Sequence, residues 1–194
     1  MEYIIWIAIG YLSGSIPTGY WIGKLKGIDL TSIGSGSTGA TNVLRNLGKG
    51  PAAVTLIIDT LKGFFPVYFA DKFVPCSFVV VSVAIFCLIG HSKSIFLKFK
   101  GGKSSATGLG VMLALSWQVA LILFLIWIVV VYITKYSSLG SIVVIPLVPV
   151  CFYLVHKPLT YILFGIFATV YIVLIRHKEN IQRLLKGTEP KIGA

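Results

Sequence analysis

Acidic residues are scarce in this sequence, and charged residues of either sign are few. Only 6 of the 194 residues are Asp or Glu, against 17 Lys or Arg, and charged residues together make up 12% of the chain. A soluble domain carries charges on about a quarter of its residues, so this chain lacks the surface of a soluble protein. With 56% hydrophobic residues and a mean hydropathy of +0.91, its outer surface must face lipid.

The sequence also lacks metal-ligand and disulfide patterns. Cys76, Cys87 and Cys151 all lie in apolar runs, with no CxxC motif and no Cys/His spacing that suits a metal. We interpret them as small hydrophobic residues. A cleavable signal peptide is not expected, because the first apolar run follows Glu2 rather than a basic segment and has no small-residue cleavage site. We expect this run to remain as a membrane span.

Long uncharged runs predict an all-α, polytopic integral membrane protein. A helix needs about 20 apolar residues to cross about 30 Å of hydrocarbon. Such runs occupy residues 3–23, 73–90, 104–134, 136–155 and 158–175, and residues 51–70 form another apart from Asp59 and Lys62. Run 104–134 is too long for one ordinary span and has a polar break near residues 116–118, so we divide it in two. The prediction is seven transmembrane spans in a single membrane domain, residues 1–194.

The distribution of basic residues supports seven spans over six. With seven, nearly all basic residues outside the spans lie on one side, and only Lys72 and Lys157 lie on the other. With six, the tail changes sides and the split becomes nearly even. Cytoplasmic loops carry the excess of Lys and Arg. We therefore place the N-terminus outside and the C-terminus inside.

A glycine-rich segment forms the first polar loop on the predicted cytoplasmic side. Residues 34–42 read G-S-G-S-T-G-A-T-N and are followed by Arg45. No strand precedes them, so a dinucleotide-binding motif is excluded. Glycines let backbone N–H groups turn toward an anion, hydroxyl groups add donors, and a helix that starts near Thr38 would favour phosphate. We favour this anion site over the alternative, a flexible polar linker with a capped helix.

The second loop combines glycines with a lysine before a helix. His91 opens it, and Gly101, Gly102, Lys103 and Ser104 close it. A Walker motif requires a glycine five residues before Gly102, but this position is occupied by Leu97. Nucleotide binding of the Walker type is therefore excluded. A second phosphate site remains, with Phe96 and Phe99 as an interfacial anchor. An ordinary basic loop is the alternative, and it explains Lys93, Lys98 and Lys100 best.

The third polar segment is the tail. Ile181, Leu184 and Leu185 recur at helical spacing, which predicts an amphipathic helix against the membrane surface. His177 and Asn180 are three residues apart and can project to the same side. A basic tail that holds the membrane is the alternative for Arg183 and Lys186.

Asp59 and Lys62 are oppositely charged residues within an apolar run. Charged groups inside a membrane are costly and often functional. A mutually neutralising pair near the interface is an equally good interpretation for Asp59, and Lys62 is a further candidate to contact phosphate.

Taken together, these segments resemble the bacterial membrane-bound glycerol-3-phosphate acyltransferase family that uses acyl phosphate as donor. The family's G-S-G-x-x-G-A-T-N-x-x-R is similar to residues 34–45, its G-H-x4-F-x-x-F-x-G-G-K-x-x-A-T to residues 90–107, and its H-x-x-N-I-x-R-L-x-x-G-x-E to residues 177–189. An early G-S-I-P at residues 14–17 also fits. Ser37 stands where asparagine is usual in the family, and Ser104 stands where glycine is usual.

The resemblance implies transfer of a fatty acyl group from acyl phosphate to the 1-hydroxyl of glycerol 3-phosphate. Products would be 1-acyl-glycerol 3-phosphate (lysophosphatidic acid) and inorganic phosphate, in the first step of phospholipid biosynthesis. The resemblance also implies that no metal or cofactor is needed. It implies a location in the bacterial cytoplasmic (inner) membrane, with the active site on the cytoplasmic side. The implied partners are membrane lipid and the soluble enzyme that produces acyl phosphate. A nucleic acid is not expected as a partner. The HX4D motif of acyl-CoA-dependent acyltransferases is missing, since no histidine has an aspartate five positions later.

The site residues divide into two sets. The expected catalytic residues are Ser35, Arg45, Lys103, His177 and Asn180. The expected substrate-binding residues are Gly36, Ser37, Thr38, Thr41, Asn42, Lys62, His91, Gly101, Gly102, Ser104, Arg183 and Glu189. Ser35, Thr41, Asn42 and the backbone of Gly101 and Gly102 are expected to hold acyl phosphate. The set for glycerol 3-phosphate is Arg45, Lys103, His177 and Asn180. Either His177 or a substrate phosphate is the base, and we favour the phosphate.

Two other classes of protein are alternatives to the enzyme interpretation. A small transporter of an organic phosphate would suit seven spans and an intramembrane charge pair, but the polar groups lie toward one membrane face rather than at mid-depth between inverted repeats. A non-catalytic lipid-binding scaffold predicts no turnover. Release of phosphate from acyl phosphate and glycerol 3-phosphate by the purified protein distinguishes these classes.

The charge bias predicts that Asn42, Lys103 and Arg183 all face the cytoplasm. Cysteines placed at these positions should resist a membrane-impermeant thiol reagent added outside intact cells. Labelling of any one of them would contradict the span count.

Overall fold

The structure is a computed structural model that describes residues 2–193, and each element in this part of the chain is a helix. The chain divides into two compact units, Met1–Leu115 and Ser116–Ala194, which are described in turn. The predicted all-α fold class is confirmed.

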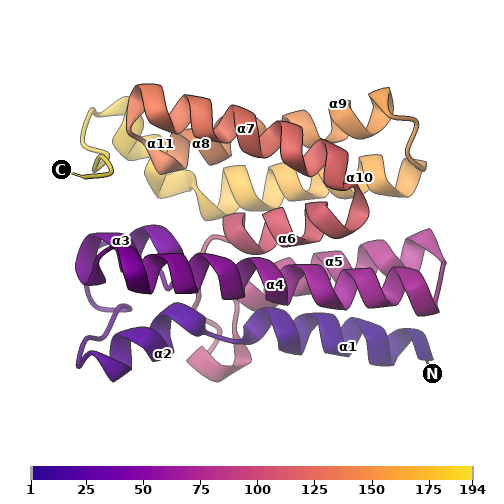
Figure 1. Cartoon of the computed structure of the whole chain (residues 1–194), viewed down its shortest axis with the longest axis horizontal. Helices are drawn as coiled ribbons and strands as arrows, with labels where there is room; N and C mark the ends of the chain where they lie inside the picture. Colours follow the sequence, from indigo (N-terminus) through magenta and orange to yellow (C-terminus); the bar gives the residue numbers. More distant parts are fainter. Residues whose placement is uncertain (1, 194) are drawn as a thin grey trace. The chain divides into compact units, whose positions relative to one another are not determined.

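The first unit carries two of the predicted polar loops between its helices. It contains α1 (Glu2–Ser15), α2 (Thr18–Leu25), α3 (Ala40–Leu47), α4 (Lys49–Phe73), α5 (Ser77–Ser92), the 3-10 helix η1 (Ile95–Leu97) and α6 (Ser105–Leu115). Helices α1, α4 and α5 lie side by side, and α6 packs against α4 (Figure 1). Pro17 has no N–H to continue a helix, so run 3–23 forms two helices instead of one.

Glycines allow the helices of the first unit to approach closely. A Cβ added at Gly14 of α1 would overlap the Cys87 carbonyl group of α5, and one added at Gly110 of α6 would overlap the Thr60 carbonyl group of α4. Lipid tails are as apolar as the side chains, so helices in a membrane associate largely through such close backbone packing. These contacts fix the helix ends from which the polar loops extend.

The second unit carries the third polar segment. Its helices are α7 (Trp117–Thr134), α8 (Ser137–Val144), α9 (Leu147–Leu154), α10 (Leu159–Ala168), the π-helix η2 (Thr169–Arg176) and α11 (Lys178–Leu185). The division of run 104–134 is confirmed, because α6 ends at Leu115 and α7 begins at Trp117. A helix in the tail is also confirmed, as α11; its contact with the membrane surface stays a prediction.

Fewer helices of the structure meet the length and composition of a membrane span than the seven that the sequence predicts. Within residues 2–193, three helices are long and apolar enough to cross a membrane: Lys49–Phe73, Trp117–Thr134 and Leu159–Arg176. A fourth is possible if α8 and α9, which meet at a bend of 41°, form one span. Helices α5 and α6 are apolar but shorter. Seven spans and the orientation stay predictions.

The exposure of Asn42 and Cys76 in the structure bears on the design of the labelling experiment. Asn42 is only 2% exposed, so a cysteine there would react poorly from either side of the membrane. Cys76 is exposed between α4 and α5 and lies, with Lys72, on the predicted outer side. Labelling of Cys76 in intact cells is therefore the positive control.

Candidate active site

Asn42 organises the glycine-rich loop from inside. Its side-chain NH2 donates to the carbonyl oxygens of Leu30 at 3.2 Å, Ile33 at 3.2 Å and Ser37 at 2.8 Å. Its side-chain oxygen accepts from the Ser35 N–H at 3.1 Å. Asn42 was expected to hold acyl phosphate, but in the structure its amide group holds the loop together. Direct contact with substrate stays a prediction.

Glycine is required at Gly34 for two reasons. Its φ of +59° is in the left-handed region, and a Cβ there would overlap the Asn42 side-chain oxygen. Gly36 also has a positive φ, of +64°. The loop is therefore an ordered structure wrapped around an amide, which argues against the flexible-linker alternative.

Helix α3 begins slightly later than predicted. It starts at Ala40 with Gly39 as N-cap, rather than near Thr38. Ser37 and Thr38 are buried, and the Ser37 hydroxyl oxygen accepts from the Gly39 N–H at 3.3 Å. Ser37 thus supports the start of the helix; its expected contact with substrate, and that of Thr38, stay predictions.

Arg45 and Thr41 lie one turn apart on α3, as the spacing predicts. Both side chains are half-buried, and the Arg45 Nε atom is shielded from solvent. A guanidinium group in such a setting is less screened than one at the surface, so it can bind an anion more strongly. The position suits the expected role of Arg45.

His91, at the end of α5, packs directly against the second glycine segment. The His91 carbonyl oxygen accepts from the Gly102 N–H at 3.1 Å. A Cβ on Gly102 would overlap the His91 ring, and one on Gly101 would overlap the His91 carbonyl oxygen. This N–H is therefore used within the protein, and the expected contact of the Gly101–Gly102 backbone with acyl phosphate stays a prediction. The two glycines allow the loop to approach α5 closely.

Ser104 occupies a backbone conformation that suits glycine. Its φ is +63°, a conformation that glycine adopts without strain. This explains why glycine is usual at this position in the family that the sequence resembles. The buried Ser104 hydroxyl donates to the Leu88 carbonyl oxygen of α5 at 2.8 Å. This hydroxyl group attaches the loop to α5, and the expected contact of Ser104 with substrate stays a prediction.

The lysines of the second loop have different environments. Lys103 is half-buried, whereas Lys93, Lys98 and Lys100 are exposed. Phe96 and Phe99 are exposed as well, in the arrangement expected of an interfacial anchor. The distinction that the sequence drew between Lys103 and the other three lysines therefore has a structural counterpart.

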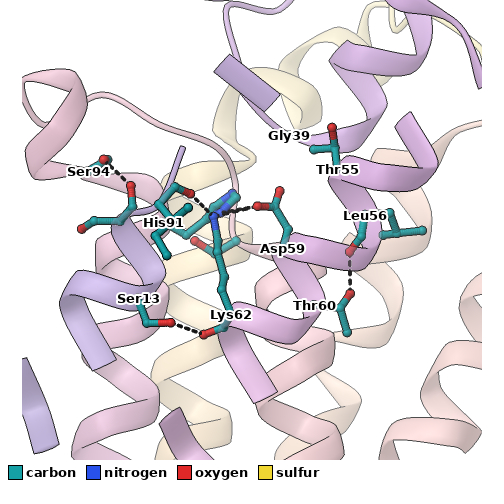
Figure 2. Close-up of polar contacts among 12 residues, drawn as sticks. Ser13, Gly39, Thr55, Leu56, Asp59, Thr60, Lys62, His91 and Ser94 are labelled. Atoms are coloured by element: carbon teal, nitrogen blue, oxygen red, sulfur yellow. Dashed lines mark hydrogen bonds and ion pairs between the residues drawn. The ribbon is translucent and has the colours of Figure 1, made fainter. Parts of the chain in front are cut away.

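Asp59, Lys62 and His91 form a buried cluster in the first unit (Figure 2). The Lys62 ammonium lies 2.7 Å from the Asp59 carboxylate and donates to the Ile16 carbonyl oxygen at 2.6 Å. The side chains of Lys62 and Asp59 are 4% and 1% exposed. A mutually neutralising pair is confirmed, although it is buried among α1, α2, α4 and α5. A contact between Lys62 and phosphate stays a prediction.

Glu189 anchors the tail of the second unit. Its carboxylate accepts from the Ser138 hydroxyl at 2.7 Å, from the Asn180 side-chain NH2 at 2.7 Å and from the Arg183 Nε at 2.7 Å. The Glu189 side chain is 2% exposed. Glu189, Asn180 and Arg183 were expected to contact substrate. In the structure, Glu189 holds the other two in place, and their own contacts with substrate stay predictions.

Ser138 was not singled out by the sequence. It lies in a run of apolar and small residues, 51 positions from Glu189 along the chain. The only local signal is a pair of adjacent serines at the start of α8, which is too common a feature to indicate a tail anchor.

His177 follows the π-helix η2 and precedes α11. Its Nδ1 atom lies 2.9 Å from the Ile172 carbonyl oxygen. Because a carbonyl oxygen can only accept, Nδ1 carries the proton, and Nε2 holds the lone pair when the ring is neutral. π-Helical segments often occur at functional sites. The carbonyl contact thus fixes the tautomer that a general base would need.

Glu189 gives a prediction about pH. Burial alone would raise the pKa of the Glu189 carboxyl, but hydrogen bonds from Ser138, Arg183 and Asn180 and the charge of Arg183 lower it below its ordinary value. A lowered pKa means that the carboxylate stabilises the fold above the unfolded-state pKa, and that this contribution is lost as pH falls through the folded-state pKa. Glu189→Gln should therefore lower thermal stability at neutral pH, by about 1.5–3 kcal/mol.

The difference between wild type and Glu189→Gln should shrink below about pH 4, where glutamate protonates. Glu179→Gln is the matched control, because Glu179 is 64% exposed and 4.0 Å from Arg183. Its effect should stay below about 1 kcal/mol. Thermal unfolding in detergent across this pH range measures both, and equal melting of wild type and Glu189→Gln at pH 7 would contradict the anchor.

Comparison with known proteins agrees with the polar segments. The glycerol-3-phosphate acyltransferase family profile matches residues 4–187. The glycerol-3-phosphate acyltransferase of Gloeobacter violaceus is 47% identical over 194 residues, covering 97% of this chain and 94% of the relative. Glycerol-3-phosphate acyltransferase 2 of Thermotoga maritima is 46% identical over 186 residues, covering 95% of this chain and 94% of the relative.

Two crystal structures of PlsY, an integral membrane glycerol 3-phosphate acyltransferase, resemble the fold. The glycerol 3-phosphate form matches with a TM-score of 0.95 and 39% identity, covering 100% of this chain and 96% of that one. The lysophosphatidic acid form matches with a TM-score of 0.92, the same identity and the same coverage. The apolar helices, the ordered glycine segments and these matches lead to one conclusion: the chain is an integral membrane protein of the glycerol-3-phosphate acyltransferase family.

Proposed function

We propose that this protein transfers a fatty acyl group from acyl phosphate to the 1-hydroxyl of glycerol 3-phosphate. The products are 1-acyl-glycerol 3-phosphate and inorganic phosphate. The observation that carries the proposal is the similarity, over the whole chain, to a PlsY structure in its glycerol 3-phosphate form. The related lysophosphatidic acid form supports the nature of the product. The donor is inferred from the resemblance and from the missing HX4D motif.

The chemistry requires positioning more than activation. Phosphate is a good leaving group, so an acyl phosphate is already activated and no covalent acyl-enzyme is needed. The enzyme must orient the two substrates and stabilise the negative charge that develops in the transition state. In this proposal Arg45 on α3 and Lys103 in the second loop, both half-buried, supply that charge stabilisation through contact with phosphate.

A proton must leave the attacking hydroxyl, and two groups can accept it. His177 presents Nε2 as the acceptor when its ring is neutral, because Nδ1 donates to the Ile172 carbonyl oxygen. The substrate's own phosphate oxygen is the other candidate. We favour the phosphate, because cationic groups that bind two phosphates disfavour a further positive charge on imidazole. In that case, His177 binds glycerol 3-phosphate together with Asn180.

The proposed setting is the bacterial cytoplasmic membrane with the polar loops on the cytoplasmic side. Exposed Phe96 and Phe99 support a loop seated at the membrane interface, where a lipid-soluble donor and a water-soluble acceptor meet. The acyl chain lies between apolar helices open to the bilayer. A soluble enzyme that makes acyl phosphate would supply the donor.

The first experiment is turnover by purified protein in detergent, with phosphate release and lipid product both measured. Acyl phosphate plus glycerol 3-phosphate should react without added metal or nucleotide, and a chelator should have no effect. Acyl-CoA should be a poor donor. Comparable rates with acyl-CoA would contradict the proposed donor, and no turnover with either donor would favour a transporter or a lipid-binding scaffold.

The second experiment tests the cationic residues. Arg45→Ala and Lys103→Ala should each lower turnover severely. A hydrogen bond between charged groups is worth about 1.5–3 kcal/mol, or about 10- to 150-fold in rate if it is fully expressed in the transition state. Lys98→Ala and Lys186→Ala are the matched controls, because both side chains are exposed and solvent and salt screen their charge.

Arg45→Lys is the more specific variant. It keeps the charge but loses the planar fork that binds phosphate through two parallel hydrogen bonds. Its activity should fall clearly below wild type. Full activity in Arg45→Lys would reduce Arg45 to a source of positive potential, and full activity in Arg45→Ala would exclude it from the reaction.

A further inference from the structure

Asp59 is a buried carboxyl side chain for which the proposed reaction has no direct use. It lies in the middle of α4, 1% exposed, and the Lys62 ammonium compensates its charge at 2.7 Å. A pair of this kind adds little to stability, because desolvation of both charges offsets their attraction. Its presence inside an apolar unit therefore calls for a role other than stability.

The structure connects Asp59 to the second glycine segment through His91. The His91 Nδ1 atom lies 3.9 Å from the Asp59 carboxylate, on one side of the ring. On the other side, the Nε2 edge of the ring lies directly against Gly102, where no Cβ could fit. The same histidine binds the Gly102 N–H with its carbonyl oxygen, at 3.1 Å.

Two hydrogen bonds hold the ends of the loop, and His91 contacts its centre. The Ser104 hydroxyl ties the far end to Leu88, and the Ser94 hydroxyl donates to the Ser15 carbonyl oxygen at 2.6 Å. Between these two points, Gly102 packs against the His91 ring. A small rotation of that ring would displace Gly102 and, with it, Lys103.

We propose that Asp59 is a positioning residue, which orients His91 and thereby sets the position of the Gly102–Lys103 segment. The inference rests on the proposed acyl transfer for its effect on activity. Lys62 acts as the counterion that allows a carboxylate to be placed beneath His91 without an unpaired buried charge. Groups that orient a binding residue in this way often affect function nearly as strongly as the residue itself.

The test uses a charge-free pair, Asp59→Asn/Lys62→Met. Asp59→Asn alone would leave Lys62 as an unpaired buried charge and destabilise the fold, so the double variant separates positioning from stability. It should keep close to wild-type thermal stability and lose about tenfold in kcat/KM for glycerol 3-phosphate, in the range that displacement of a binding group produces. Asp71→Asn/Lys72→Met, which removes the same charges from the exposed end of α4, should retain wild-type activity.

The route through His91 is tested by a double-mutant cycle. In a His91→Gln background, the charge-free pair should change kcat/KM by less than about twofold, because the group through which Asp59 acts is already altered. Wild-type activity in the charge-free pair, or an equal loss in both backgrounds, would overturn the proposal. If wild type itself shows no turnover, the proposed function fails instead.

Hydrogen exchange provides a readout that does not depend on activity. Peptides that cover residues 101–104 should exchange faster in the charge-free pair than in wild type, since displacement of Gly102 by the His91 ring would weaken the hydrogen bond from the Gly102 N–H to the His91 carbonyl oxygen. The Asp71→Asn/Lys72→Met control should match wild type. Unchanged protection of residues 101–104 in a folded charge-free pair would overturn the positioning role, whatever the activity.

Discussion

In a chain that faces lipid, buried charged and backbone polar groups must find partners within the protein, and this constraint shapes much of the structure. Water is absent from the hydrocarbon region, and an unsatisfied polar group there costs several kcal/mol. Asp59 is accordingly placed beside Lys62 within the helices of the first unit. In the second unit, the Glu189 carboxylate receives three hydrogen bonds. The hydrogen bonds to Glu189 also order the tail segment that carries Asn180 and Arg183.

Both ordered loops of the first unit depend on close approach of backbone to a polar side chain. Asn42 fills the space that side chains at Gly34 would need, and the His91 ring fills the space beside Gly102. The glycines thus serve the internal packing of the loops. A phosphate-binding loop requires rigid donors, because flexible ones lose conformational entropy on binding. The inward-facing amide and imidazole provide that rigidity.

The candidate site residues therefore separate into two groups. Asn42, Ser104 and Glu189 have side chains that form hydrogen bonds within the protein and hold the loops and the tail in shape. Arg45 and Lys103 are half-buried cations on those ordered segments, which suits contact with phosphate.

Periodicity, charge and composition by themselves determined the all-α fold class, the membrane character, the break between α6 and α7 and the helix in the tail. These features follow from local sequence, since hydrophobic runs and polar breaks act over a few turns of helix. The sequence also distinguished Lys103 from Lys98, because glycines and hydroxyls flank only the former, and the two lysines differ in burial in the structure. Tertiary structure alone decided which donors face inward. The hydrogen bond from the Gly102 N–H to the His91 carbonyl oxygen and the one from Ser138 to Glu189 join segments that are separated along the chain. Local sequence patterns carry no information about such contacts.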